Sequence, residues 1–153
     1  MKAKLLDKRC TPVKATPGAG CYDLVARKIT KSEIQVYIPV VGRHNVNEVK
    51  SIDRYEIKLG LEMEIPENFQ GILSARSSLS KTGFTIPHGH GEIDSDFRGE
   101  IRLVIVGRGK CPYEVGDRCC QFRLVEVPPI DWEFVEELSK TDRGNGGFGH
   151  TKK

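Results

Sequence analysis

An alternation of apolar and polar residues with a period of two is the feature that most constrains the fold of this chain. From Tyr55 to Ile65 every second residue is apolar, and Gly60 falls in the middle of the series. Such a period places successive side chains on opposite faces of an extended strand, so a half-buried strand with a bend at Gly60 is expected. Residues 34–40 alternate in the same way, and Pro39 predicts a strand at the edge of its sheet.

Further short strands and the scarcity of helical periodicity indicate an all-β fold. Strands are expected at residues 71–75, 100–106 and 121–127, separated by glycine and proline turns. The best helical candidate is residues 131–138, where apolar residues recur at spacings of three and Asp131 is placed as an N-cap. Many short strands between such turns are typical of a sandwich or barrel, and 153 residues suit a single domain.

Two segments differ from this pattern. Residues 41–54 are polar and poorly periodic, which predicts an excursion on the surface. Residues 141–153 contain four glycines and a single aromatic residue, Phe148, and cannot build a core of their own. We therefore expect a β domain over residues 1–140 and a C-terminal arm over residues 141–153 that closes over another surface.

The composition argues against several classes of protein. The 24 basic and 21 acidic residues give a net charge of +3, which is too balanced to predict nucleic-acid binding. There is no apolar run of membrane-spanning length, so no membrane partner is expected. The five cysteines include no C-x-x-C pair, which argues against a disulfide scaffold or a zinc site. A reducing, cytoplasmic compartment is expected, and a nuclear, viral or phage context stays open.

Five short blocks occur in a characteristic order along the chain. The third block reads G-E-I-D-S-D-F-R-G, and the set comprises residues 17–24, 75–80, 91–99, 116–122 and 143–149. Together they resemble the motifs of the trimeric dUTP pyrophosphatase (dUTPase) family. The resemblance implies a distorted jelly-roll-like (β-clip) subunit, a homotrimer with sites at subunit contacts, and hydrolysis of dUTP to dUMP and pyrophosphate. Such a reaction keeps uracil out of DNA and supplies dUMP for dTMP synthesis.

The resemblance assigns the chemistry to the third block. Asp94 matches the general base that activates water for in-line attack at the α-phosphorus, whereas spacing alone also allows a turn carboxylate that caps backbone amides. Mg²⁺ is the implied cofactor. Because Mg²⁺ prefers phosphate oxygens and retained waters, Asp23 in the first block is expected to contact the metal through water.

The resemblance also implies how the substrate would be bound. Arg76, Ser77, Ser78 and Gln121 are expected to hold the triphosphate. The hairpin over residues 88–93 is expected to read uracil through backbone groups, with His88, Glu92 and Ile93 among its members. Phe97 stands where the family usually has tyrosine, and its ring would leave no space for a ribose 2′-hydroxyl.

The arm is expected to complete the site. In the fifth block Arg143 would reach the γ-phosphate, Phe148 would stack on uracil, and Gly149 would help the backbone wrap around the phosphates. The glycines of this block also satisfy a G-x-G-x-x-G pattern, but no strand–helix unit surrounds them, so a dinucleotide site is rejected.

Two alternatives were weighed against this function. dCTP deaminase shares an R-S-S-L block but needs a glutamate ten positions after the hairpin aspartate, where this chain has Val104. That enzyme is therefore disfavoured. A regulatory protein-binding role, which some dUTPase-like proteins of phages have, stays open because the excursion at residues 41–54 is longer than most relatives need. The pair His88 and His90 lacks further ligands at zinc-binding spacing.

Overall fold

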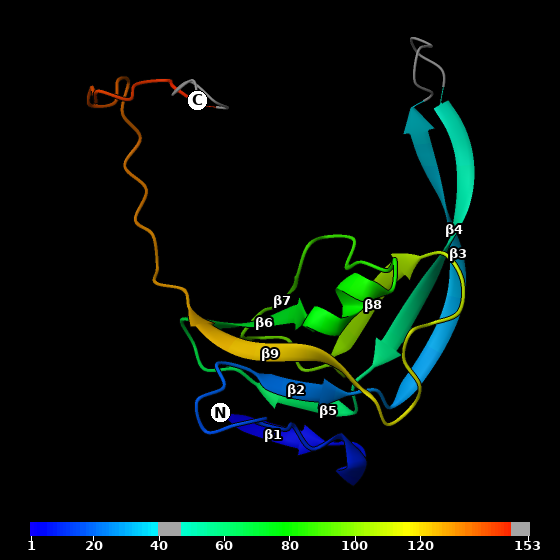
Figure 1. Cartoon of the computed structure of the whole chain (residues 1–153). Coiled ribbons are helices and arrows are strands. Elements are labelled where there is room, and N and C mark those ends of the chain that lie inside the picture. Colours follow the sequence, from blue (N-terminus) through cyan, green and yellow to red (C-terminus); the bar gives the residue numbers. More distant parts are fainter. Residues whose placement is uncertain (40–46, 148–153) are drawn as a thin grey trace.

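A computed structural model describes residues 1–39 and 47–147 of the chain. These residues form three antiparallel sheets, with strand orders β1-β5, β2-β9-β6-β7 and β3-β4-β8 (Figure 1). The all-β prediction is confirmed, since the only helices in the described part are two short 3₁₀ segments, η1 and η2, and no helix there could cross a membrane. The elements are β1 (Lys2–Leu5), η1 (Lys8–Cys10), β2 (Tyr22–Val25), β3 (Lys28–Pro39), β4 (Asn47–Lys58), β5 (Leu61–Glu64), β6 (Phe69–Ala75), η2 (Ser77–Lys81), β7 (Gly91–Ile93), β8 (Arg102–Gly107) and β9 (Arg118–Glu126).

Gly60 is the point at which the long alternating segment changes sheets. The chain leaves β4 at Lys58, turns through Gly60 with φ +65°, and enters β5, which pairs with β1. A Cβ atom at Gly60 would lie 2.7 Å from Sγ of Cys10, so both the backbone conformation and the available space require glycine. The expected bend is confirmed, and it separates two strands of different sheets.

The apolar half of the alternating pattern forms the core. Ile57 of β4 and Ile105 of β8 are completely buried and belong to the same hydrophobic cluster as Leu73 of β6 and Phe122 of β9. Cys119 and Cys120 are also completely buried, as expected for packing residues. Burial of these side chains supplies most of the favourable free energy of folding.

The excursion predicted for residues 41–54 does lie on the surface over residues 48–54, none of which is buried, but the expectation that it lacks regular structure is wrong, because residues 47–54 belong to β4. This strand pairs with β3 along its whole length, whereas β8 pairs only with Asp53–Lys58. The β3–β4 ladder therefore projects beyond the body of the molecule (Figure 1), and residues 40–46 of the excursion lie outside the described residues. Residues 47–54 show little hydrophobic alternation, although they pair with the alternating residues of β3. The cross-strand pair of Tyr37 and Val49 is correspondingly exposed. The prediction of an edge position is confirmed for β3.

The helix predicted over residues 131–138 is also wrong, because this segment has no regular secondary structure. Its large apolar side chains are exposed, with Phe134 at 92% and Leu138 at 85%. A helix this short needs an apolar surface on which to pack. The chain here runs away from the sheets (Figure 1), so these apolar side chains find no surface among the described residues on which to pack.

A partly buried ion pair joins Arg27, which precedes β3, to Glu100, which directly follows the third sequence block. The Arg27 guanidinium donates to both Glu100 carboxylate oxygens at 2.8 and 2.7 Å, and the Gly60 amide donates to the same carboxylate at 2.9 Å. The Arg27 contact, with help from the Gly60 amide and Lys58, holds the pKa of Glu100 below its usual 4.5 despite partial burial.

Glu100→Gln is therefore expected to destabilise the protein by about 2 kcal/mol at pH 7, since it leaves the Arg27 charge without its partner. A carboxyl group whose folded pKa is lowered stabilises the fold above its unfolded pKa, and this contribution is lost as pH falls through the folded value. Denaturant unfolding at several pH values should show a difference between variant and wild type that shrinks below about pH 4.5. A difference that is constant down to pH 3 would contradict this assignment.

Candidate active site

The hairpin around β7 encloses a pocket that collects several of the predicted site residues. Backbone pairing of Gly91 with Leu73 and of Ile93 with Gly71 attaches β7 to β6, and Gly89, with φ +80°, forms the turn before it. The pocket has a volume of about 220 Å³, and the predicted residues that line it are His88, Glu92, Ile93, Asp94 and Phe97. The structure thus brings together the expected uracil-reading hairpin, the expected base and the expected sugar gate.

Asp94 follows β7 directly and is exposed at the mouth of this pocket. Its backbone carbonyl accepts the Phe97 amide at 3.2 Å and so opens a tight turn. Its carboxylate makes no hydrogen bond or ion pair within residues 1–39 and 47–147. Among the described residues, the carboxylate therefore accepts no backbone amide, as the alternative role of a cap would require. Both carboxylate oxygens are available to accept a proton from water.

The Phe97 ring lies against Gly99. A Cβ atom at Gly99 would be only 2.6 Å from Cζ of Phe97, so the glycine makes room for the ring. The side chain is 40% exposed and forms part of the pocket wall beside Asp94. An aromatic face in this position is suited to contact a sugar, and the surrounding backbone limits how far it can retreat.

Arg98 fixes the turn that carries Asp94 and Phe97. Its Nη1 donates to the carbonyls of Ser95 at 2.6 Å and Phe97 at 3.0 Å.

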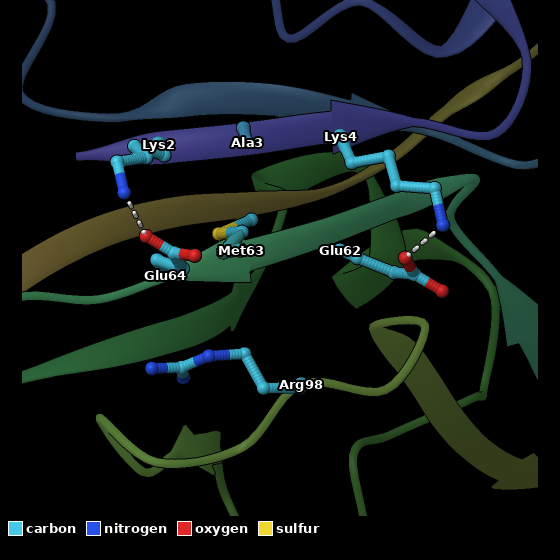
Figure 2. A pocket seen from close by; sticks show the side chains of 7 residues that line it. All are labelled: Lys2, Ala3, Lys4, Glu62, Met63, Glu64 and Arg98. Carbon is cyan, nitrogen blue, oxygen red and sulfur yellow. Dashed lines mark hydrogen bonds and ion pairs between the residues drawn. The ribbon is translucent and has the colours of Figure 1, made fainter.

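Figure 2 shows Arg98 across a separate charged pocket from two lysines of β1, Lys2 and Lys4. Each lysine is paired with a glutamate of β5 at 2.9 Å, so this second pocket is lined by completed ion pairs between two strands.

A second group of predicted residues surrounds the buried carboxylate of Asp23. Asp23 is 3% exposed and lies on β2 opposite Gln121 of β9, whose Nε2 donates to it at 3.2 Å. The arginines Arg76 and Arg118 approach its two oxygens, with Nε of Arg76 at 3.5 Å and Nη1 of Arg118 at 3.2 Å. Nη1 of Arg76 also donates to the Arg118 carbonyl at 2.8 Å. We call Asp23, Arg76, Arg118 and Gln121 the arginine cluster.

Arg118 belongs to this cluster, although it was not among the residues expected at the site. The one available signal was indirect: a buried carboxylate such as Asp23 needs cationic partners, and Arg118 belongs to the same block as Gln121. The neighbouring Asp117 braces the turn before β9, because its carboxylate accepts the Glu114 amide at 2.8 Å.

Ser77 and Ser78 follow Arg76 at the start of η2. Arg76 occupies the N-cap position with an extended backbone, and no side chain caps the first amides of the 3₁₀ helix. Both serines are exposed, and the Ser77 carbonyl accepts the Ser80 hydroxyl at 2.7 Å. Ser77 and Ser78 are thus exposed residues that directly follow Arg76 of the arginine cluster.

The pocket beside Asp94 and the arginine cluster lie at opposite ends of β6. The pairing of Gly71 with Ile93 places Asp94 beside the first residues of this strand, whereas Arg76 follows its last residue. Six residues of extended chain span about 20 Å. A single chain therefore does not bring the expected base to the expected phosphate-binding residues.

Arg143, the one named arm residue that the structure describes, is not brought to either place within one chain. Arg143 turns back on its own segment, where its Nε donates to the Gly146 carbonyl at 2.9 Å. This segment lies well away from the sheets (Figure 1). Phe148 and Gly149 lie outside the described residues.

The donors around Asp23 fit an indirect role toward a metal ion. Three protein groups already point at its carboxylate, whose two oxygens have room for about four hydrogen bonds. The remaining capacity suits a metal-bound water better than direct coordination. In the described part of the chain, no three carboxylate, histidine or cysteine side chains are arranged to hold a metal by themselves. A triphosphate would supply the oxygen ligands that Mg²⁺ prefers.

Comparison with known proteins identifies similar chains. The dUTPase family model matches residues 8–152. A deoxyuridine 5′-triphosphate nucleotidohydrolase of Finegoldia magna is 34% identical over 99% of both chains. Its counterpart in Fusobacterium nucleatum is 38% identical over 72% of this chain and 80% of its own.

Solved structures share the fold. A mutant dUTPase of Staphylococcus bacteriophage 80alpha with dUpNHpp superposes with a TM-score of 0.73, at 21% identity over 98% of this chain and 96% of its own. A mutant from phage phi11 of S. aureus, described with a structural Mg(II) ion, has a TM-score of 0.65 at 20% identity over 91% of this chain and 98% of its own. The expected jelly-roll-like subunit is thereby confirmed.

Proposed function

Because the chain belongs to the dUTPase family and hydrolyses dUTP, we propose that Asp94 is the general base of this reaction. The observation that carries the proposal is the exposed Asp94 carboxylate, which has no hydrogen-bond or ion-pair partner among the described residues and lies in the wall of a pocket formed by the β7 hairpin. A water held by this carboxylate would lose its proton as it attacks the α-phosphorus in line with the leaving group. The products are dUMP and pyrophosphate.

The β7 hairpin recognises the base and the sugar of the nucleotide. Backbone groups of residues 88–93 present fixed donors and acceptors to uracil, and a cytosine would leave some of them unpaired. Each buried polar group without a partner costs about 1–3 kcal/mol. The Phe97 ring stands against the deoxyribose and rejects a 2′-hydroxyl by its bulk. His88 and Glu92 line the same pocket and complete its polar rim.

The arginine cluster, with Ser77 and Ser78, binds the triphosphate. Asp23 holds Arg76 and Arg118 in place, so that their remaining N–H groups face the adjoining surface. The two serine hydroxyls and the uncapped amides at the start of η2 donate to non-bridging oxygens. Mg²⁺ bound to the triphosphate would reduce its negative charge, with Asp23 accepting a hydrogen bond from a metal-bound water.

The separation of these two parts supports a homotrimer with composite sites. Asp94 and Arg76 lie about 20 Å apart along β6. This distance is too large for one chain to bring both its general base and its phosphate-binding residues to the same nucleotide. A neighbouring chain would supply the arginine cluster to the β7 pocket. The arm of residues 141–153, including Arg143, Phe148 and Gly149, would then close over the nucleotide.

A mixing experiment tests this arrangement. Asp94→Asn and Arg76→Ala subunits are each expected to be inactive alone. After unfolding and refolding together in equal amounts, about one quarter of the sites should combine an intact Asp94 with an intact Arg76 from a neighbour. Turnover of dUTP should recover to that fraction of the wild-type value.

The wild-type protein carried through the same refolding is the control and must release pyrophosphate from dUTP. If both residues of a site came from one chain, the mixture would stay inactive while the control recovered. That result would exclude the composite site without touching the hydrolytic activity.

A further inference from the structure

The position of the Asp94 carboxylate depends on the backbone of its turn. No hydrogen bond or ion pair from the described residues reaches this carboxylate, so no neighbouring side chain among them sets its direction. The turn from Asp94 to Phe97 is closed by one backbone bond, from the Phe97 amide to the Asp94 carbonyl at 3.2 Å. A surface turn with so few bonds fluctuates unless a further contact holds it.

Arg98 is the one side chain of the described residues that supplies such a contact. Its Nη1 donates to the Ser95 carbonyl within the turn at 2.6 Å and to the Phe97 carbonyl at its end at 3.0 Å. Neither carbonyl accepts another hydrogen bond within residues 1–39 and 47–147. The two N–H groups of Nη1 lie in the guanidinium plane and point in different directions, so this nitrogen holds the two carbonyls in a fixed relation.

The charges around Arg98 leave its guanidinium to this turn. Glu64 lines the same pocket, but its carboxylate is already paired with Lys2 at 2.9 Å (Figure 2). The other glutamate of the pocket, Glu62, is paired with Lys4 at the same distance. Arg98 itself has no ion pair among the described residues, so the hydrogen bonds of its guanidinium there are both with carbonyls of the turn.

We propose that Arg98 is a positioning residue, which holds the turn so that Asp94 meets the attacking water and Phe97 meets the sugar in one fixed geometry. The inference rests on the proposed roles of Asp94 and Phe97. A displacement of about 1 Å at a reacting group costs about 10²-fold in rate. A loosened turn is therefore expected to slow the chemical step and to weaken the rejection of a ribose at the same time.

The test is Arg98→Met, which keeps most of the side-chain stem and removes both hydrogen bonds. We expect kcat for dUTP to fall about tenfold to 100-fold, with KM changing by no more than about threefold. The ratio of kcat/KM for dUTP to kcat/KM for UTP should fall about tenfold, because the Phe97 carbonyl is released as well. This ratio does not depend on how much of the enzyme is folded, so a loss of stability alone leaves it unchanged.

Two further variants show whether Arg98 acts through the turn. Arg98→Lys keeps a cationic donor on a side chain that is one bond shorter, and it should recover part of the rate and of the selectivity. In an Asp94→Asn background, Arg98→Met should lower kcat by no more than about twofold, because the base on which it acts is already lost. The fall in the dUTP-to-UTP ratio should persist in that background, since Phe97 is still present.

Arg9→Met is the matched control. Arg9 is another exposed arginine, whose Nε and Nη2 donate to Asp7 at 3.1 and 2.7 Å, and it lines neither of the pockets that Asp94 borders. Its substitution removes the same charge and should leave kcat and the dUTP-to-UTP ratio within about twofold of the wild type.

An unchanged kcat or an unchanged dUTP-to-UTP ratio in Arg98→Met, in an enzyme that Asp94→Asn inactivates, would overturn the inference alone. So would equal losses in Arg9→Met, or a further tenfold loss of kcat from Arg98→Met in the Asp94→Asn background, on the order expected for the single variant. A fully active Asp94→Asn variant would instead remove the proposed base, and with it the premise of this inference.

Discussion

Asp94→Asn is expected to lower kcat for dUTP by about 10²- to 10⁴-fold, the usual contribution of a positioned general base. Asparagine has the same shape but cannot take a proton from the attacking water. The Asp94 carboxylate makes no contact with the described residues, so the substitution should leave the melting temperature within about 1 °C of wild type. Steady-state kinetics should show the loss in kcat, with KM changing little.

Asp96→Asn provides the matched control. Asp96 lies two residues further along the same exposed turn and lines a different pocket from the one that holds His88 and Phe97. Its substitution removes an equal charge from the hairpin and should change kcat by no more than about threefold. Equal losses in the two variants would mean that the charge of the turn matters and that Asp94 has no special role.

Truncation after Asp142 is expected to produce a folded protein with little turnover. The described residues 143–147 hydrogen-bond only within the arm, as in the contact from Arg143 to Gly146, so their removal should not change the melting temperature. The loss of a charge-assisted phosphate contact and of stacking on uracil should remove about 3–6 kcal/mol of binding. The ratio kcat/KM should therefore fall by about 10²- to 10⁴-fold.

A shorter truncation that removes only residues 151–153 distinguishes the contribution of the arm from that of its charged tip. It keeps Arg143, Phe148 and Gly149 and should retain nearly full activity. If the truncation after Asp142 kept the wild-type kcat/KM, the arm would have no role in the site, and the division into a domain of residues 1–140 and an arm would lose its functional meaning.

Local alternation was sufficient to predict most of the strands. The apolar positions of the pattern from Tyr55 to Ile65 are buried, and Gly60, which falls within the pattern, lies where the chain changes sheets. Alternation failed for residues 47–54, because that part of β4 pairs with β3 without facing a core. The prediction of a helix at residues 131–138 was wrong for a related reason, since its apolar side chains pack on no surface of the described residues.

The site was harder to predict because its parts depend on pairing between distant segments. The predicted residues of the hairpin, from His88 to Phe97, are close in sequence, and the five of them named for the site line one pocket. The contact of Arg118 with Asp23 depends on the pairing of β2 with β9, which no local pattern encodes. Likewise, only the register of β6 and β7 reveals that Asp94 and Arg76 are far apart. The regulatory protein-binding role stays a prediction.

The most direct test of the central claim is pyrophosphate release from dUTP, UTP, dCTP and dTTP, each with and without Mg²⁺. We expect rapid release from dUTP with Mg²⁺, and rates at least about 100-fold lower for the other three nucleotides, because each leaves hairpin groups unpaired or collides with the site. Removal of Mg²⁺ should slow the reaction with dUTP. Comparable rates for UTP and dUTP, or release of ammonia from dCTP, would contradict the account.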